Sequence, residues 1–94
     1  MINVIVTDEL VEISGHAGMG APGQDIVCAA VSALGNTAAS LMWEDPDERD
    51  GYLLIHYRSS DRDEVGYIRF LVAGLLMISE QYPDALEVQD FRSN

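Results

Sequence analysis

Four short stretches of this chain are predicted to be β-strands, and apolar residues alternate along the first and the last of them, with the period of two that is typical of a strand with one buried face. Only Asp8 and Glu9 separate the first two stretches, so we expect these to pair as a hairpin. The third stretch is apolar at most positions, which is typical of a buried strand. The predicted strands are residues 2–7, 10–14, 52–57 and 86–91.

Two longer segments repeat apolar residues at the spacing of an α-helix. The first helix is expected to begin after Asp25, because aspartate is a favoured N-cap residue. The second is expected at about residues 65–82, with Asp61 or Asp63 available as its cap and Pro83 at its end. The apolar stripe of the first helix, which should lie on the sheet, comprises Ile26, Ala29, Ala30, Ala33, Leu34, Ala38, Leu41 and Met42.

The elements follow the order ββαβαβ, and residues 1–94 are enough for one small domain. Their simplest arrangement is an α/β fold of the two-layer α+β type, in which two helices pack on one face of a four-stranded mixed or antiparallel sheet. We interpret residues 44–51 as an acidic connector before the third strand. The second helix is apolar over more of its circumference than such a sheet needs to cover, which favours a homodimer.

The charge balance limits the partners that this chain can have. Sixteen acidic residues face five arginines, there is no lysine, and the formal net charge is −11. Such a charge repels nucleic acid and anionic membranes, so neither is expected as a ligand, whereas basic protein segments are attracted. The ordinary alternative is that the acidic residues form a solvated face that keeps the domain soluble.

Cysteine content and hydropathy indicate the compartment. A single cysteine cannot form an internal disulfide, which suits a reducing environment. The N-terminus has no recognisable export signal. The longest apolar stretch, residues 70–78, is too short to cross a bilayer and is interrupted by Gly74. We therefore expect a cytoplasmic protein.

The candidate chemistry lies at the glycine-rich loop between the second strand and the first helix. His16 follows the end of the strand, and Cys28, the only cysteine, falls at the third helical position after the predicted cap Asp25. A helix start favours a thiolate, a neighbouring imidazolium favours it further, and free N–H groups there can hold a developing oxyanion. The pair therefore predicts a nucleophile with its general acid and base. Ser32 lies one turn further on the same helix face, where it can contact the thiolate or a substrate carbonyl.

Each of these residues also has an ordinary structural interpretation. A lone cysteine in an apolar helix is usually an inert core residue. A lone histidine at a strand end is usually a surface or capping residue, and Ser32 can simply fill a gap between alanines. His56, inside the third strand and away from any loop, is expected to be structural.

Nucleotide and metal sites are not indicated. Gly18, Gly20 and Gly23 imitate the glycine spacing of a phosphate loop, but no lysine follows and the chain is too short for a dinucleotide fold. The two histidines and one cysteine are scattered over different elements and lack the close ligand pairs of zinc sites. No cofactor and no metal are therefore expected.

Two segments, residues 14–34 and residues 80–84, carry the most distinctive motifs of the chain. The first resembles, almost residue for residue, the principal block of the ribosomal-processing cysteine protease (Prp) family, and the second resembles the block that ends that family's second helix. The resemblance implies a small homodimeric enzyme that removes a short N-terminal extension from the large-subunit ribosomal protein numbered twenty-seven, before or during ribosome assembly. The implied site residues are His16 and Cys28 as the catalytic pair, with Asp25 and Ser32 beside them.

The resemblance also implies a loop that orders around the substrate, whose cleavage site follows a pair of aromatic residues. Met19 stands where the family commonly has an aromatic residue, and Ala21-Pro22 makes the loop stiffer. These departures leave the depth of the groove and the exact cleavage sequence open. The substrate-loop residues so implied are Gly18, Met19, Gly20 and Gly23.

Two functions other than proteolysis remain as alternatives. A non-catalytic module of the same fold would bind the same peptide or ribosomal protein without cutting it, but such a module has no need of an intact His16 and Cys28. A redox-sensing thiol protein would oxidise Cys28 reversibly, and the chain holds no second cysteine to resolve the product internally. Cleavage of a peptide distinguishes the protease from both alternatives.

Overall fold

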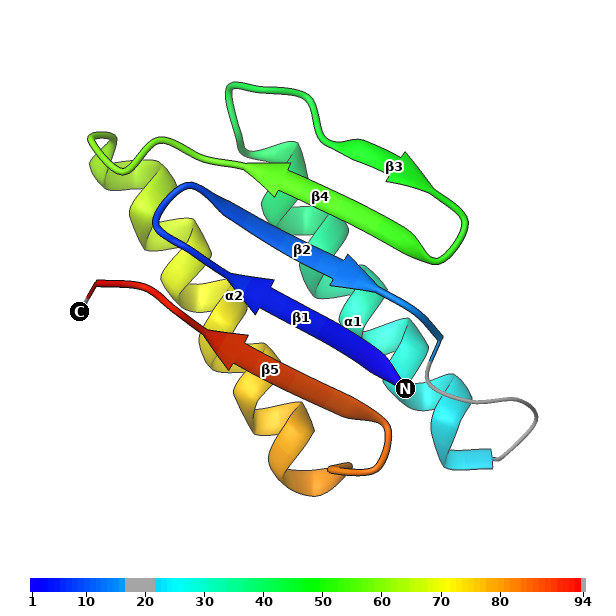
Figure 1. The fold of residues 1–94 in the computed structure, drawn as a ribbon. Coiled ribbons are helices and arrows are strands. Elements are labelled where there is room, and N and C mark those ends of the chain that lie inside the picture. The colour runs from blue at the N-terminus through cyan, green and yellow to red at the C-terminus, as the bar shows by residue number, and fades with distance from the viewer. Residues whose placement is uncertain (17–21, 94) are drawn as a thin grey trace.

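The structure, a computed structural model, describes residues 1–16 and 22–93, with side chains in the second stretch from residue 26 onward. Its strands and helices form two layers, with both helices behind the sheet in Figure 1. Among the described residues, no helix is long and apolar enough to span a bilayer. The elements are β1 (Ile2–Val6), β2 (Leu10–Ser14), α1 (Pro22–Ser40), β3 (Asp47–Arg49), β4 (Tyr52–His56), α2 (Arg62–Gln81) and β5 (Leu86–Asp90).

The strands form one mixed sheet in the order β3-β4-β2-β1-β5. β1 and β2 pair antiparallel, which confirms the predicted hairpin, whereas β1 and β5 pair parallel. The predicted fold class, α+β with two helices on one face of a mixed sheet, is therefore confirmed. The sheet has five strands instead of the predicted four, because β3 forms within the segment that we interpreted as a connector.

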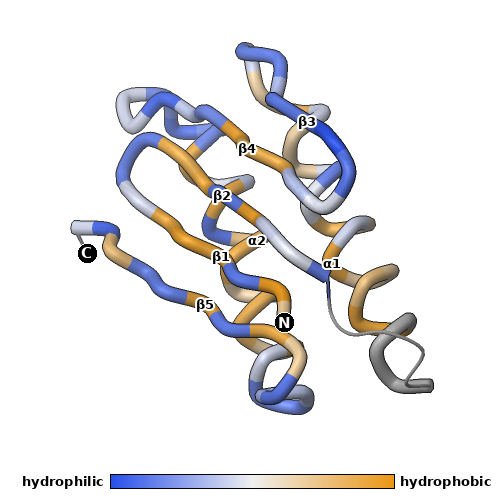
Figure 2. The backbone as a smooth tube through the Cα atoms, turned by 45° about the vertical axis from the view of Figure 1, so that its right-hand side comes forward, coloured by the Kyte–Doolittle hydropathy of each residue, from blue (hydrophilic) through white to orange (hydrophobic). Residues whose placement is uncertain are grey.

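The hydropathy pattern does not predict β3, because β3 is an exposed edge strand in which every residue is charged. All three of its residues, Asp47, Glu48 and Arg49, are exposed, and Figure 2 draws this segment in the blue of hydrophilic residues. It pairs only with β4, with Arg49 opposite Tyr52. A charged edge strand protects a sheet from pairing with other chains, and it leaves no apolar alternation to detect.

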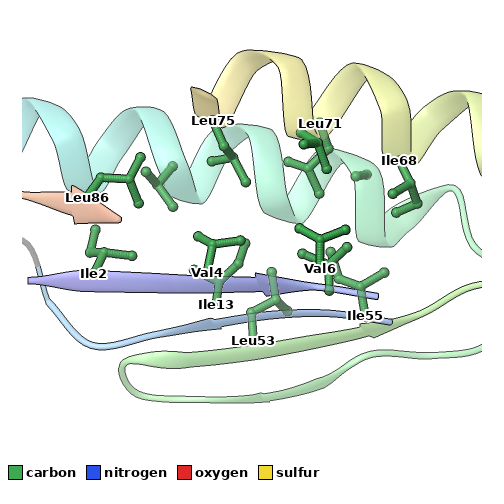
Figure 3. Close-up of a cluster of buried hydrophobic side chains, with 14 of the residues drawn as sticks. Ile2, Val4, Val6, Ile13, Leu53, Ile55, Ile68, Leu71, Leu75 and Leu86 are labelled. Atoms are coloured by element: carbon green, nitrogen blue, oxygen red, sulfur yellow. The ribbon is translucent and has the colours of Figure 1, made fainter. Parts of the chain in front are cut away.

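The apolar core lies between the sheet and the two helices, as Figure 3 shows. The alternating strands turn one face toward the helices, and α2 presents a stripe of buried residues to that face. Burial of one such aliphatic side chain contributes about 1.5–3 kcal/mol. The most deeply buried large members are Val4, Val6, Val11, Val27, Ile55, Ile68, Leu71, Val72, Leu75 and Leu86.

α1 begins at Pro22, so the prediction of Asp25 as its N-cap is wrong. Proline suits the first turn of a helix because its φ is already helical and its missing N–H has no partner there. Asp25 is consequently a residue of the first turn, and Cys28 lies in the second turn instead of at the third helical position.

The predicted sheet-facing stripe of α1 is also largely wrong. Val27 and Val31 are the residues buried against the sheet near Cys28, whereas Ile26 is 61% exposed and Leu41 is 49% exposed. The observed face is rotated by about one residue from the predicted one. Because α1 is apolar on nearly all sides, periodicity alone does not select the face that packs.

α2 matches its prediction closely. Asp61 is its N-cap, and the carboxylate accepts hydrogen bonds from the N–H groups of Asp63 (3.0 Å) and Glu64 (3.1 Å). The helix ends at Gln81, shortly before Pro83. The cap satisfies two of the four N–H groups that a helix start leaves unpaired, which fixes where α2 begins.

Candidate active site

His16, Cys28 and Ser32 line one pocket with a volume of about 500 Å³. The pocket lies where the end of β2, the N-terminal half of α1 and the β3–β4 hairpin meet. Apolar core residues such as Val31 and Leu53 form part of its wall. Three residues that the sequence singled out are therefore brought together from two separate elements.

His16 is positioned by the turn that ends β2. Gly15 has a φ of +96°, a value that favours glycine, and its N–H donates to the Gly51 carbonyl oxygen at 2.8 Å. The His16 side chain is exposed and lies against Gly51, because a Cβ built on Gly51 would be 2.7 Å from His16 Nε2. The imidazole thus rests on the turn of the β3–β4 hairpin.

Cys28 is half-buried and packs against the apolar core. The unpaired N–H groups of a helix belong to its first four residues, and the dipole effect fades beyond the first turn. Because Cys28 lies in the second turn of α1, the helix start offers it neither the oxyanion donors nor the strong thiolate stabilisation that we expected.

The remaining predicted residues divide into two groups. Ser32 is exposed and lies on the pocket wall, one turn after Cys28. Asp25 belongs to the first turn of α1, but its side chain lies outside the described part of the structure. The residues predicted for the substrate loop, Gly18, Met19 and Gly20, lie outside the described residues, and Gly23 is described only as a backbone position of α1.

The sequence interpretation missed the hairpin wall of the pocket. Glu48, Arg49, Asp50 and Gly51 line the side opposite α1, in the segment that we interpreted as a connector. The sequence feature that could have predicted this hairpin is the dipeptide Asp50-Gly51, which is frequent in the turn between two paired strands. The β3–β4 hairpin is therefore part of the pocket that holds the predicted catalytic pair.

Tyr52 anchors this wall to the open face of the sheet. Its hydroxyl donates to Glu12 Oε2 at 2.9 Å, and the Arg49 guanidinium lies over its ring, 4.3 Å from the centroid. The hydrogen bond to Glu12 is the main reason that the pKa of Tyr52 is raised above 10.0. These contacts fix the charged strand β3 relative to β2.

No group of three or more His, Cys, Asp or Glu side chains arranged to hold a metal ion occurs within the described ranges. His56, predicted to be structural, is half-buried on β4, and its Nε2 lies 3.6 Å from Asp47 Oδ2. His56 does not line the pocket.

Comparison with known proteins gives a family match and several structural neighbours. The family model described as "Cysteine protease Prp" matches residues 1–87. Among curated proteins, the comparison finds no significant match.

Solved structures of similar chains cover nearly the whole length. The ribosomal processing protease Prp of Staphylococcus aureus, in complex with a substrate peptide, is 26% identical with a TM-score of 0.82, and covers 96% of this chain and 99% of its own. The same protease with a covalently linked product peptide has 26% identity, a TM-score of 0.80 and the same coverage. The protein SMU.848 of Streptococcus mutans is 27% identical with a TM-score of 0.74, and covers 98% of this chain and 93% of its own.

Proposed function

Because this chain belongs to the Prp family of cysteine proteases, we propose that Cys28 and His16 are its catalytic pair and that it cuts the N-terminal segment of a ribosomal protein precursor. The observation that carries this proposal is that Cys28 and His16 reach one pocket from α1 and from the end of β2. A family of cysteine proteases requires a cysteine nucleophile, and Cys28 is the only cysteine in the chain.

The proposed mechanism uses the two residues in turn. The Cys28 thiolate attacks the scissile carbonyl carbon, and the His16 imidazolium gives its proton to the leaving amine, so that an acyl thioester forms as the peptide bond breaks. His16 then takes a proton from water, which attacks the thioester carbon; the C–S bond breaks, so that the new carboxyl group leaves and the Cys28 thiolate forms again beside the His16 imidazolium. Since the helix start is distant from Cys28, we assign the hydroxyl of Ser32 as a donor to the substrate on the same helix face.

Charge supports a basic substrate. The chain has a net charge of −11, and Glu48 and Asp50 lie on the pocket wall. Acidic surfaces attract basic segments and raise the rate of encounter with them. The neighbouring S. aureus enzyme is a ribosomal processing protease that was solved with a substrate peptide. We therefore propose the precursor of the large-subunit ribosomal protein numbered twenty-seven as the substrate, cut in the cytoplasm where ribosomes assemble.

Cleavage of a synthetic peptide that carries the N-terminus of the host's ribosomal protein tests the proposal, with mass spectrometry as the readout. We expect one cut by the wild type and none by Cys28→Ala or His16→Ala. His56→Ala is the matched control, because His56 lies outside the pocket, and it should cut like the wild type. Retained cleavage by Cys28→Ala would refute the proposed nucleophile, and binding without cleavage by the wild type would favour the non-catalytic module.

We also propose that the protein pairs with a second copy through the outer face of α1 and α2. Three large apolar side chains on this face are strongly exposed, namely Ile26 (61%), Phe70 (75%) and Met77 (63%). Two apolar grooves, of about 240 Å³ and 350 Å³, run between the helices beside them. Exposed apolar surface of this kind marks interaction sites.

The distribution of charge indicates that the occupant is another copy. No charged residue occurs between residues 26 and 43, and Arg69 is the only one between residues 65 and 79. Elsewhere two copies of so acidic a chain repel each other, whereas this face brings no carboxylates together. Sedimentation analysis tests the proposal: Phe70→Glu should be monomeric, and Phe91→Glu, an exposed aromatic away from both helices, should stay dimeric. A monomeric wild type would refute it.

A further inference from the structure

We propose that Gly51 is a positioning residue for His16: the absence of a side chain at Gly51 leaves the space in which the imidazole is held at the pocket wall. This inference rests on the proposed catalytic role of His16. The β3–β4 hairpin would then position the His16 ring in addition to forming one side of the pocket.

Three atoms of the imidazole lie close to the position that a Cβ of residue 51 would occupy. The distances from that position are 2.7 Å to Nε2, 3.2 Å to Cε1 and 3.4 Å to Cδ2 of His16. The ring therefore lies across the Cα of Gly51, which is itself half-buried. Real Cβ atoms essentially never come as close as 2.7 Å to another heavy atom, so any side chain at this position must displace the ring.

Backbone contacts hold the two residues in this register. Ser14 pairs with Tyr52 across β2 and β4, and the Gly15 N–H donates to the Gly51 carbonyl oxygen at 2.8 Å. His16 follows directly, so its Cα cannot slide along the hairpin without loss of this pairing. The ring is the part that is free to move away from an added methyl group, because it is the end of a flexible side chain.

A purely structural role makes a different prediction for the same substitution. Gly51 has a φ of +70°, a region that side chains other than glycine rarely adopt, so a substitution strains the turn. If the turn alone matters, Gly51→Ala lowers the melting temperature and leaves the chemistry of each folded molecule unchanged. If the ring is displaced, the chemistry changes even where the variant is fully folded.

The test compares Gly51→Ala with the wild type at a temperature where circular dichroism shows both to be folded. We expect kcat on the cleaved peptide to fall by roughly 10- to 100-fold, since small misplacements of a catalytic group cost about that much, with KM nearly unchanged. The pH dependence of Cys28 alkylation by iodoacetamide should move toward that of His16→Ala. Gly66→Ala is the control, because an added Cβ there meets nothing within 4 Å, and it should match the wild type.

Two further measurements separate the interpretations. The ¹H–¹³C signals of the His16 ring should shift in Gly51→Ala while those of His56 stay in place. In the His16→Ala background, Gly51→Ala should change the rate of Cys28 alkylation no further, because the two changes remove the same contribution. If Gly51→Ala does not fold, Gly51→Asn supplies the same Cβ in a residue that tolerates positive φ better.

An unchanged kcat, alkylation profile and His16 signal in a folded variant would overturn the inference and leave Gly51 as a turn residue. A raised KM with unchanged kcat would overturn it too, because the added group would then obstruct substrate instead of moving His16. Failure of the proposed function is distinguishable: it shows as cleavage that survives in Cys28→Ala and His16→Ala themselves.

Discussion

The two halves of the pocket are held in place by different forces. Cys28 lies on α1 and packs against the apolar core between the helices and the sheet. His16 lies on the opposite side, where its ring rests on Gly51 and its segment is joined to the β3–β4 hairpin by a backbone hydrogen bond. Since every residue of β3 is exposed, strand pairing and polar contacts hold this wall, with no apolar burial from β3 itself.

Because of this difference, the stability of the fold and the position of His16 in the pocket are expected to depend on different residues. Burial of an aliphatic side chain contributes about 1.5–3 kcal/mol, and a hydrogen bond contributes about 0.5–1.5 kcal/mol net. A change in the core is therefore expected to lower the free energy of unfolding strongly without moving His16. A change in the contacts of the hairpin is expected to cost less stability and to alter the reactivity of Cys28 more.

The largest loss of stability is expected for Leu75→Ala. Leu75 is fully buried on α2, and its truncation should lower the free energy of unfolding by about 2–5 kcal/mol because it removes apolar burial and leaves a cavity. Urea denaturation measures the loss. Leu76→Ala, at a neighbouring position that is 40% exposed, is the control and should lose much less. Equal losses in the two variants would contradict the position of the core.

Glu64→Ala is expected to have an intermediate effect and to act on the hairpin side. Its buried carboxylate accepts from the N–H of Trp43 at 2.7 Å and from the N–H of Arg58 at 2.8 Å. These two residues flank the segment that contains β3 and β4. Removal of the carboxylate leaves both N–H groups without this acceptor, which should cost about 1–3 kcal/mol.

The reactivity of Cys28 sharpens this prediction. Although Leu75→Ala is the less stable variant, Glu64→Ala should change the rate of Cys28 alkylation more, because it loosens both ends of the hairpin that supports His16. Glu80→Ala, an exposed glutamate on the same helix, is the control and should match the wild type in both assays. If alkylation followed stability across all these variants, the two halves of the pocket would not be independently held.

Much of the fold could be predicted because most elements bury one face. The alternation in β1 and β5, the short turn between β1 and β2, and the apolar run of β4 predict the strands, and the two candidate caps Asp61 and Asp63 bracket the start of α2 to within two residues. α1 is harder to predict, because Pro22 follows a glycine-rich stretch that is typical of a loop, and because apolar residues on almost every side of the helix leave its buried face undetermined. β3 has no apolar residue at all, and only its pairing with β4 makes it a strand.

The residues of the site also divide into those that the sequence predicts and those that only the tertiary structure identifies. Residue chemistry and the family resemblance predict His16, Cys28 and Ser32, and the structure brings them to one pocket. Gly51 is not predicted from the sequence, because its proposed role depends on the side chain of His16, which is distant in sequence and lies against it. A glycine that provides space for a neighbour leaves no local pattern, so only the tertiary structure identifies it.

The smallest effect is expected at Tyr52, which holds the open face of the hairpin through Glu12 and Arg49. The hydrogen bond to Glu12 raises the pKa of Tyr52 above its ordinary value of 10.0. A raised pKa in the folded state means that the contribution to stability is complete below the unfolded value and is lost as the pH rises through the folded value. The contact should therefore weaken only in alkaline solution.

Tyr52→Phe removes both the hydrogen bond and this titration. The wild type should be slightly more stable than the variant at about pH 8, and the difference should shrink by about pH 11, as Tyr52 begins to ionise beside Glu12. Denaturation of both proteins at the two pH values measures this difference in stability. Burial raises the pKa of Tyr57 as well, but Tyr57 is present in both proteins, so its ionisation cancels from the difference. A difference that stays constant with pH would mean that the Tyr52 hydroxyl contributes no pH-dependent stability.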